Sequence, residues 1–525
     1  MKRISLLFVL LALLIFGAAC SSSDNENAEK SGNNNAEGES EVSAEDKVLT
    51  VAYSSPLPST DPQGISASAR RIVDANVFNR LFRRTADMGL EPELVEEYEM
   101  TDDTTLQATL IEGITFHNGD PVTAEDVKYS IERVALDETH VEYTFFKPIT
   151  GVEVIDELTF EVTTEEPLPV LLDLLSKPAS DILPKNYIEE NGIEHFLENP
   201  IGSGPYQYVE WIKDDRVIME PYEDYFEDVD LDWEEVIVRS IPEASTRVGE
   251  LLTGNVQIID EIPPNEWDRV DGAEGVSLVK GESSRVLMLV VRVDGEDSPL
   301  SDPKVREAID LAINKEVLSE DVLQGSGIPV RSRSPKTIHG GHPDLTDVDL
   351  YDPEKAKELL AEAGYPDGFE IEFAAPTGGY LLIEEVTEMI VQMLGEVGIT
   401  ANLEQRTVNA LIEDLQLGNN NGLSLIGYSH AYPDASYAMS SYYSGRGSKT
   451  TGYINEEFDE LYEDVLSNLD DDERVQNLYK MQEIIAEDRP YIHLYQQLND
   501  IGVSDSIEYE PRLDEQIYLP DVKRK

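Results

Sequence analysis

The sequence predicts an α/β protein, because short apolar runs typical of strands alternate with segments that have the apolar spacing of helices. The chain has 525 residues, which at about 150 residues per domain corresponds to roughly three domains' worth of core. Hydrophobic residues make up 40% of the chain and charged residues 28%, so most of it is expected to fold. No internal repeat is found in the sequence.

The amino-terminal half of the folded body is expected to begin with a strand at residues 48–53, followed by a loop rich in Ser and Pro. Apolar residues recur at helical spacing over 72–82. Thr123 and Asp126 have the spacing of a capping box, and predict a helix from there to about Val134. Further strands are expected at 105–110, 152–164 and 205–220, and a helix near 167–176.

The pattern of apolar and polar residues changes at about Arg285. The carboxyl-terminal half is expected to begin there, with a buried strand at 286–293. Asp302 and Asp352 each precede a proline, which places a capping residue and a favoured first residue before a helix. Gly364 is expected to end the second of these helices. The expected helices lie at 304–313, 354–363, 381–397 and twice within 455–489, and the expected strands at 369–374, 399–405, 423–428 and 491–496.

The first 19 residues read as a signal peptide: two cations precede an apolar stretch, Ile4 to Ala19, that is too short to span a membrane. The small residues before Cys20 resemble a lipobox, which implies that Cys20 is lipidated; the alternative is an ordinary secretory peptide with an incidental cysteine. Residues 20–46 are polar and predict a flexible tether. We therefore expect a protein anchored by lipid at the extracellular face of the cell membrane.

The charge of the chain excludes several classes of partner. Its 106 acidic and 40 basic residues give a net charge of −66, which opposes binding to nucleic acids and to anionic lipid headgroups. A single cysteine excludes a disulfide framework and a multi-cysteine metal site. The acid excess is interpreted as adaptation to salty or alkaline surroundings, with attraction of cationic solutes as the alternative.

Two segments imitate enzyme motifs. Residues 427–431 resemble a nucleophile elbow around Ser429, but Pro433 disfavours the helix that an elbow needs. Residues 445–450 resemble a phosphate-binding loop, but Ser448 stands where the second glycine belongs. We therefore predict that the protein is not an enzyme, and keep an exported hydrolase using Ser429 as the weakest alternative.

Two further segments imitate metal sites. The acidic loop that begins at Asp228 has Trp233 where a calcium loop needs glycine, and Arg239 where it needs glutamate. His339 and His342 flank two glycines, and no third ligand is evident. No metal site and no cofactor are therefore predicted.

Several motifs, in order along the chain, resemble the family 5 extracellular solute-binding proteins, the peptide- and nickel-type receptors of ABC importers. The first is LQATLIEGITFHNGDPVTAEDVKYSIER at 106–133. The others are PIGSGPY at 200–206 with Trp211, DPKVREA at 302–308, and the segment 356–366. The resemblance covers about residues 48–510.

The resemblance implies a two-lobed fold like that of the periplasmic binding proteins, of type II and the large peptide-binding class. Lobe I would comprise residues 48–283 and 494–525, with an extra subdomain at about 75–195, and lobe II would comprise 284–493. The chain would cross between the lobes near 283–286 and 494–497. Two crossings favour closure of the lobes about a hinge.

The candidate ligand-binding residues come from loops that follow strands, where open α/β sheets bind ligands. Gly378 and Gly379 would allow close approach of a ligand to the backbone, and the tyrosines offer flat faces with polar tips. The candidates are Tyr53, Ser54, Ser55, Thr377, Gly378, Gly379, Tyr380, Tyr428, Ser429, His430, Ala431, Tyr432 and Asp434.

The chain departs from the pattern of the family's peptide receptors at three of these positions. Those receptors often carry Trp at the position of Tyr428 and, at Ala431, an Asp that pairs with the amino terminus of the ligand. Dipeptide receptors place an Arg near Thr377 for the ligand carboxylate. Asp434 is considered as a replacement for the missing carboxylate, and extended peptides held through their backbone remain compatible with the sequence.

The resemblance and the absence of a catalytic constellation together predict a receptor that binds a small solute, an oligopeptide by first preference, and delivers it to the transmembrane subunits of an ABC permease. A metal–chelator complex, for which His430 is suited, or an oligosaccharide is the alternative solute. The protein is expected to be a monomer that meets the membrane only through its lipid anchor.

Overall fold

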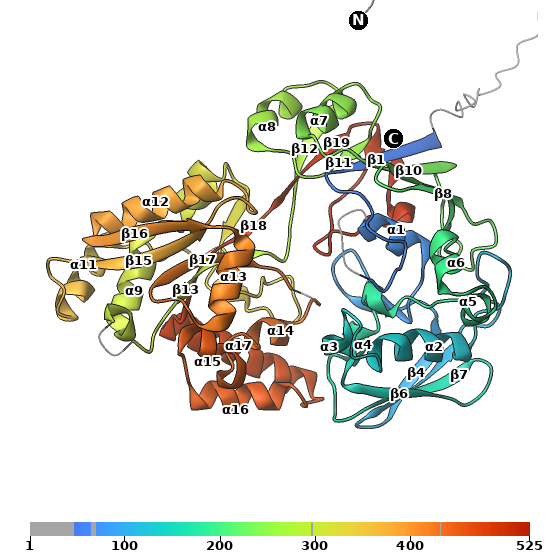
Figure 1. Cartoon of the computed structure of the whole chain (residues 1–525), viewed down its shortest axis with the longest axis horizontal. Helices are drawn as coiled ribbons and strands as arrows, with labels where there is room; N and C mark the ends of the chain where they lie inside the picture. Colours follow the sequence, from blue (N-terminus) through green and yellow to red (C-terminus); the bar gives the residue numbers. More distant parts are fainter. Residues whose placement is uncertain (1–46, 65–69, 296–297, 431) are drawn as a thin grey trace, which may run out of the picture. The chain divides into compact units, whose positions relative to one another are not determined.

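The computed structural model describes residues 47–64, 70–295, 298–430 and 432–525. The predicted signal peptide, the tether with Cys20, and the candidate site residue Ala431 lie outside these residues. Within the described ranges, no helix has the length and apolar character needed to cross a membrane. Strands and helices alternate along the chain, as predicted for an α/β protein (Figure 1).

A seven-stranded sheet, ordered β12-β19-β11-β1-β10-β9-β8, organises one part of the chain. Strand β1 (Val48–Tyr53) lies between β10 and β11 and is parallel to both. Its carboxyl end therefore meets the carboxyl ends of its two neighbours at one edge of the sheet. The other elements here are α1 (Arg70–Val77), β8 (Tyr206–Ile212), β9 (Arg216–Pro221), β10 (Glu235–Ser240), α7 (Ala244–Leu252), β11 (Ile258–Ile259), α8 (Pro264–Asp271), β12 (Val276–Gly281), β19 (Asn499–Ser504), β20 (Ile507–Glu508) and β21 (Lys523–Arg524).

A four-stranded antiparallel sheet, ordered β4-β5-β7-β6, packs against helix α2 (Ala124–Ala135). The predicted capping box begins this helix: the backbone N–H and hydroxyl of Thr123 donate to the Asp126 carboxylate at 2.9 and 2.6 Å. The other elements are β2 (Phe82–Arg84), β3 (Leu90–Pro92), β4 (Val95–Asp102), β5 (Thr105–Leu110), α3 (Tyr143–Phe146), β6 (Ile149–Val154), β7 (Thr159–Thr164), α4 (Leu171–Leu174), α5 (Lys185–Asn191) and α6 (Ile193–Glu198).

A six-stranded sheet, ordered β14-β18-β13-β17-β15-β16, has a hydrophobic core on each face. Alternate residues of β13 (Val286–Val291) enter the two cores, because successive strand side chains point to opposite faces. The other elements are α9 (Pro303–Ala312), α10 (Lys315–Val317), β14 (Gly327–Pro329), α11 (Pro353–Glu362), β15 (Phe369–Pro376), α12 (Ile383–Glu396), β16 (Ile399–Arg406), α13 (Val408–Leu417), β17 (Leu423–Tyr428), α14 (Ala435–Met439), α15 (Ser444–Thr451), α16 (Glu456–Val465), α17 (Asp471–Asp488) and β18 (Tyr491–Gln497).

The chain passes between the two large sheets twice, from β12 to β13 and from β18 to β19 (Figure 1). Side chains join the two crossings: the Ser283 hydroxyl donates to the Gln497 carbonyl at 2.7 Å, and the Gln496 amide donates to the Ser283 carbonyl at 2.8 Å. The boundary between the lobes that was predicted at 493/494 stays a prediction. In the structure, residues 494–497 belong to β18 and therefore to the six-stranded sheet. Below, lobe I denotes 48–281 with 499–525, and lobe II denotes 286–497.

Two of the sequence motifs lie against each other in lobe I. The His117 N–H donates to the Gly202 carbonyl at 2.8 Å, and its ring contacts the Gly202 N–H and the Gly204 carbonyl at 3.2 and 3.0 Å. Burial lowers the pKa of His117 to about 4, so the ring is neutral at physiological pH. A Cβ on Gly202 would lie 1.9 Å from the Val77 carbonyl oxygen. The glycines of the second motif are therefore needed for close packing of backbones.

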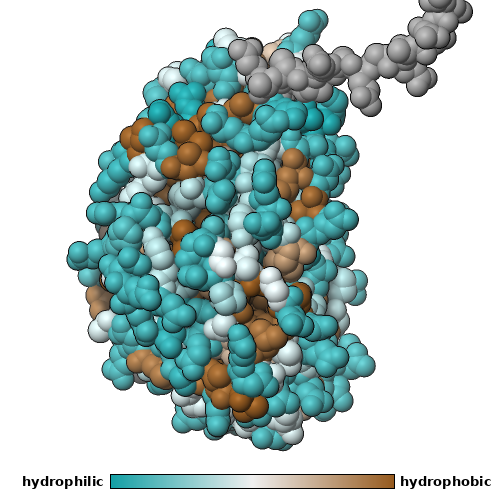
Figure 2. Space-filling view, turned by 90° about the vertical axis from the view of Figure 1, so that its right-hand side faces the viewer, coloured by the Kyte–Doolittle hydropathy of each residue, from teal (hydrophilic) through white to brown (hydrophobic). Residues whose placement is uncertain are grey.

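Hydrophilic residues cover most of the face drawn in Figure 2, as the net charge of −66 requires. Some of this acid is paired internally. In the acidic loop that imitates a calcium site, Lys523 lies 3.5 Å from the Asp230 carboxylate, and the Arg524 N–H donates to Asp232 at 3.1 Å. The loop therefore holds the carboxyl-terminal strand β21.

Candidate functional site

The predicted site loops follow strands whose carboxyl ends are grouped by parallel pairing. In lobe I, β1 is parallel to β10 and β11, and in lobe II, β15 is parallel to β16 and β17. The loops after β1, β15 and β17 therefore emerge from the carboxyl edges of the two sheets, where α/β folds bind ligands. Two cavities open at these edges.

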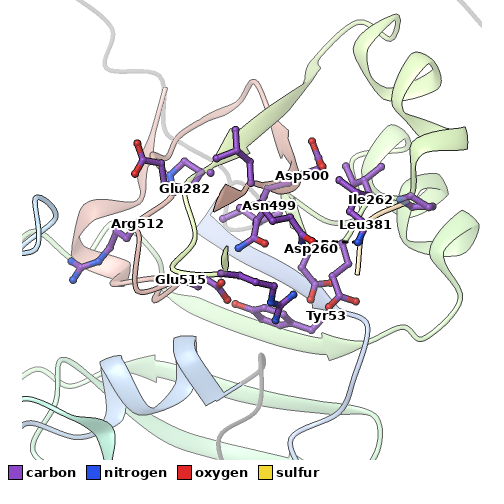
Figure 3. Close-up of a pocket in the computed structure, with 18 of the residues that line it drawn as sticks. Tyr53, Asp260, Ile262, Glu282, Leu381, Asn499, Asp500, Arg512 and Glu515 are labelled. Carbon is purple, nitrogen blue, oxygen red and sulfur yellow. Dashed lines mark hydrogen bonds between the residues drawn. The ribbon is translucent and has the colours of Figure 1, made fainter. Parts of the chain in front are cut away.

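The first, here called the hinge cavity, has a volume of about 500 Å³ and is lined by both lobes and both crossings. In Figure 3, Tyr53, Asp260 and Leu381 lie at one side of this cavity and Glu282 and Arg512 at the other. Its charged and amide side chains are Asp260, Glu261, Glu282, Arg285, Gln497, Asn499, Asp500, Arg512 and Glu515.

The second, here called the interlobe cavity, has a volume of about 370 Å³. Lobe I contributes charged groups, the ring of Phe145 and the segment 513–516; lobe II contributes the loop after β17. Its charged lining residues are Asp74, Arg80, Arg84, Glu142, Lys177, Asp514 and Glu515.

One carboxyl-terminal turn, Arg512–Glu515, borders both cavities. The Glu515 N–H donates to the Arg512 carbonyl at 3.0 Å, and Arg512 pairs with Asp514 at 2.8 Å. Glu515 has a φ of +59°, in the left-handed region that is costly for a side chain with Cβ. Glu515 lines both cavities, so we treat them as adjoining parts of one site.

The structure places six predicted residues in the two cavities. Tyr53, Gly379 and Tyr380 line the hinge cavity, whereas Ser429, His430 and Tyr432 line the interlobe cavity. Of the other predicted residues, Ser55 borders a shallow depression of about 10 Å³. Those that line neither cavity are Ser54, Thr377, Gly378, Tyr428 and Asp434.

These remaining residues support the loops instead. The Ser54 N–H donates to the Asp260 carboxylate at 3.0 Å. The Gly378 N–H donates to Glu384 at 2.9 Å, at the start of α12. These bonds hold the ends of the loops that carry Tyr53 and Tyr380.

Asp434, considered from sequence as a partner for a ligand amino group, is fully buried in an ion pair. Both of its oxygens accept from Arg474 at 2.8 Å, and one also accepts the Ser436 N–H at 2.9 Å. Burial acts to raise the pKa of Asp434, but the hydrogen bonds and charge of Arg474 hold it below its ordinary value. In this structure the carboxylate fixes the loop and is not presented to either cavity.

Arg333 supports the same loop from behind. Its guanidinium lies 4.9 Å from the Tyr428 ring and 5.4 Å from the Tyr437 ring, and donates to the Ser429 carbonyl at 3.3 Å. The His430 ring contacts the Arg333 carbonyl at 3.2 Å. Burial, with Arg333 nearby, lowers the pKa of His430 to about 3, so the ring is neutral at physiological pH.

Tyr432 projects from lobe II against lobe I. Its ring centroid lies 6.2 Å from that of Phe145 and 5.3 Å from that of Tyr437, both edge-on. The ammonium of Lys177 lies 4.0 Å above the Phe145 ring and pairs with Glu142 at 2.8 Å. Aromatic and cationic groups from the two lobes thus form one wall of the interlobe cavity.

We expect Tyr432→Ala to weaken solute binding by about 1–3 kcal/mol, the range for truncating a packed aromatic anchor. Isothermal titration of both proteins with the same solute measures the change. Tyr351→Ala, at an exposed tyrosine of lobe II that lines neither cavity, is the matched control and leaves affinity unchanged. Equal solute affinities of the Tyr432→Ala variant and the native protein would show that this wall of the interlobe cavity does not contact the solute.

Two carboxyl groups of the hinge cavity resist ionisation. Burial, with the charge of Glu261, raises the pKa of Asp260 to about 7, although Arg247 acts in the opposite direction. Burial also raises the pKa of Asp500 to about 6, while the Ser326 hydroxyl donates to it at 2.9 Å. Raised carboxyl pKa values of this kind occur where nearby positive charge and hydrogen bonds do not fully offset the cost of burying a carboxylate, and they are frequent in functional sites.

The raised pKa of Asp260 has a consequence for stability. Because its pKa in the folded protein exceeds that of an unfolded chain, folding becomes less favourable as pH rises from about 4 to 7. We expect Asp260→Asn to stabilise the protein without solute by about 1–4 kcal/mol at pH 8, and the gain to fall below about 1 kcal/mol by pH 4. Urea unfolding of both proteins across this range tests it. A gain that is independent of pH would show that charge is not the cause.

Asp260, Arg285, Gln497 and the turn 512–515 were not predicted as site residues, although the resemblance placed Arg285 and Gln497 in the crossings between the lobes. Candidate residues were sought in loops that follow predicted strands. Asp260 follows β11, and this strand has only two residues, so it was not predicted from the sequence. Gln497 and the turn come from the far end of the chain, and the two crossings bring them beside β1 and β11. Within the described chain, no group of three or more His, Cys, Asp or Glu is arranged to hold a metal ion.

The histidines that flank the two glycines each contact a carboxylate on α17. His339 lies 2.8 Å from Asp471, and His342 lies 3.2 Å from Glu483. The His342 ring also packs against Tyr479, with ring centroids 4.9 Å apart. These contacts attach the 339–342 loop to the helix.

Comparisons with known proteins agree on one family. The sequence model for bacterial extracellular solute-binding proteins, family 5 (middle region), matches residues 89–450. The glutathione-binding protein GsiB of Salmonella typhi is 26% identical over 459 residues, which cover 85% of this chain and 88% of that protein. GsiB of Shigella flexneri is equally similar, at 26% identity over the same shares.

Solved structures have the same fold at lower identity. HbpA2 from Haemophilus parasuis aligns with a TM-score of 0.82 at 22% identity, covering 91% of this chain and 100% of that one. The unliganded open form of the murein tripeptide binding protein MppA has a TM-score of 0.81 at 18% identity, covering 91% and 97%. The oligopeptide-binding protein AppA of Bacillus subtilis, with a nonapeptide, has a TM-score of 0.69 at 21% identity, covering 91% and 99%.

Proposed function

Because the chain belongs to the bacterial extracellular solute-binding proteins of family 5, we propose that it binds an oligopeptide-like solute between its two lobes and delivers it to the permease of an ABC importer. The family consists of binding proteins of ABC importers, so the protein is a binding protein and not an enzyme. This sets aside a hydrolase built on Ser429. The protein has the fold of the periplasmic binding proteins.

The observation that carries the proposal is the pair of adjoining cavities between the lobes. Together they give a site with polar and aromatic walls that continues past the Arg512–Glu515 turn. An extended chain suits such a site, because its backbone offers hydrogen-bonding groups at regular intervals while its side chains enter separate pockets.

The ligands of related proteins support a peptide-like solute. GsiB of Salmonella typhi binds glutathione, AppA of Bacillus subtilis was solved with a nonapeptide, and DppA of Helicobacter pylori with the peptide STSA. NikZ of Campylobacter jejuni, solved with a nickel–histidine complex, represents the alternative of a metal chelate. In this chain His430 gives that alternative little support, because its ring is buried, its Nε2 is bonded to the Arg333 carbonyl, and the nearby positive charge of Arg333 would repel a metal ion.

The proposal includes the location and partners predicted from the amino-terminal sequence. We propose that Cys20 carries the lipid that holds the protein at the outer face of the cell membrane. Residues 20–46 would then tether the folded body beside its permease. Metabolic labelling with a radioactive fatty acid, compared with a Cys20→Ser variant, tests the anchor.

Native mass spectrometry of the purified protein, followed by isothermal titration, tests the proposed solute. We expect a peptide to be carried through purification and released on unfolding. After its removal, we expect mixed peptides to bind, and maltooligosaccharides and nickel–histidine not to bind. Binding of the sugars or the nickel complex alone would overturn the peptide assignment and leave the family assignment intact.

A further inference from the structure

We propose that the hinge cavity binds a cationic amino group of the solute, with Asp260 as its anionic partner and the side-chain amide of Gln497 as donor to a neighbouring carbonyl. This assignment rests on the proposed function, and it narrows the solute class to compounds in which an ammonium group lies close to a carbonyl oxygen. A peptide with a free amino terminus meets this description. The argument depends on four observations.

The first is the free oxygen of Asp260. Its Oδ1 accepts the Ser54 N–H at 3.0 Å and lies 3.6 Å from the Arg247 Nε. Both contacts use the same oxygen, and no other residue of the described chain donates to Oδ2. The backbone bond to Ser54 fixes the carboxylate at the carboxyl end of β1, where its residue lines the cavity beside Tyr53 (Figure 3). Asp260 is therefore held in place with one oxygen left for a guest.

The second is the available donor of the Gln497 side-chain amide. The residue is 6% exposed and lines the hinge cavity. Its Oε1 accepts the Leu381 N–H at 3.3 Å, which fixes the orientation of the amide, because the opposite orientation would bring two donors together. Among the described residues, Nε2 donates to no acceptor, and the atom is not among the buried ones. An amide donor that is fixed in orientation and open at the wall of a cavity can donate to a guest acceptor such as a carbonyl oxygen.

The third is the charge of the cavity wall. Five carboxyl residues and two arginines line it. One arginine, Arg512, is already paired with Asp514 at 2.8 Å, and the other, Arg285, lies 5.8 Å from the Tyr380 ring. The surplus of negative charge in a partly enclosed site favours a cation over a neutral or anionic guest.

The fourth is the proton affinity of Asp260. Burial and Glu261 raise its pKa to about 7, so it is partly protonated at neutral pH when no guest is present. A cation beside Oδ2 favours the ionised form of Asp260. Binding near pH 7 is therefore expected to release, on average, a fraction of one proton per protein molecule. A cation in the site would also remove the like-charge repulsion from Glu261.

The assignment gives the chain an amino-group site at a position different from that of the family's usual peptide receptors. The sequence carries Ala431 where those receptors often have an aspartate, and Asp434 is occupied by Arg474. Asp260, at the opposite lobe and beside the crossings, supplies the missing carboxylate. Because the crossings form one wall, a guest held there contacts the segments about which the lobes would move.

Isothermal titration at pH 7 with an equimolar tetrapeptide pool, and with the same pool after N-acetylation, tests the assignment. For the native protein we expect the free pool to bind at least tenfold more tightly. For Asp260→Asn we expect the ratio to fall below threefold, because only the free amino group depends on this carboxylate. The matched control is Asp268→Asn, an exposed aspartate of α8 that lines neither cavity, and it keeps the native ratio.

Repeating the titrations in phosphate and in Tris, which differ in ionisation enthalpy, measures protons released on binding. We expect release from the native protein with the free pool, and none from Asp260→Asn. Equal affinities of the two pools for the native protein, or an unchanged ratio in Asp260→Asn, would overturn the assignment and leave the proposed function standing. Failure of both pools to bind the native protein would overturn the proposed function, and this assignment with it.

Discussion

Replacing Arg474 by Met lowers the free energy of unfolding by about 3–5 kcal/mol, the range expected when one partner of a buried ion pair is removed. The side chains of Arg474 and Asp434 are 3% and 1% exposed, and two bonds of 2.8 Å join them. The Arg474 Nε also donates to the Val465 carbonyl at 2.9 Å. Without Arg474, the Asp434 carboxylate would stay buried beside α14 with no counter-charge.

Urea unfolding followed by circular dichroism measures the loss. The control is Arg269→Met, which removes an exposed arginine that pairs with Glu266 on the same helix at 2.9 Å, and costs less than about 1 kcal/mol. Adding Asp434→Asn to Arg474→Met recovers part of the lost stability, since the uncompensated charge is gone. A loss below 1 kcal/mol for Arg474→Met alone would contradict the role given to this pair.

Substituting Gly202 by Ala is the second large effect, and we expect it to cost about 2–4 kcal/mol. The added Cβ would lie 1.9 Å from the Val77 carbonyl oxygen and 2.8 Å from the Phe78 ring, so the backbone near His117 must shift. Overpacking of this kind typically costs 1–3 kcal/mol, and more where backbone atoms must move.

The same substitution at Gly249 is the control, because nothing lies within 4 Å of its Cβ position in helix α7. Ala is favoured over Gly in a helix, so Gly249→Ala is neutral or stabilises by up to about 1 kcal/mol. Thermal and urea unfolding of the two variants give the comparison. If Gly202→Ala is as stable as Gly249→Ala, the two motifs do not pack as described.

Elements with local signals could be predicted from the sequence to within a residue or two. Asp302-Pro303 and Asp352-Pro353 predicted helices at 304–313 and 354–363, and α9 and α11 span Pro303–Ala312 and Pro353–Glu362. Their caps act on neighbouring residues, so the sequence alone carries the information: Asp302 accepts the Lys304 N–H, and Asp352 the Lys355 N–H.

Elements that depend on distant partners were missed, and the turns inside strand-like segments were not located. The strand-like segments expected at 152–164 and 205–220 each form a hairpin, β6–β7 and β8–β9. Strand β19 was not predicted, because its residues have little apolar periodicity and its order comes from pairing with β11 and β12. Pairing between distant strands has no local signature.

Site residues that follow clear strands were predicted from the sequence, whereas those placed by distant parts of the chain were not. Tyr380 and Tyr432 follow visible strands and line the cavities. Asp434 also follows β17, but Arg474, forty residues further along the chain, determines that it is buried. Gln497 and the 512–515 turn enter the site because the chain returns to lobe I at its end. The resemblance implied that return, but no motif at those positions predicts that they line a cavity.

Closure of the two lobes on a bound solute is the central claim, and small-angle X-ray scattering with and without solute tests it most directly. Hydrogen bonds of Ser283 with Gln496 and Gln497 join the two crossings, and we propose that crossings joined in this way favour opening and closing of the lobes. With a peptide shown by titration to bind, we predict that the radius of gyration falls at saturation. Scattering curves that superimpose with and without the bound peptide would contradict the account.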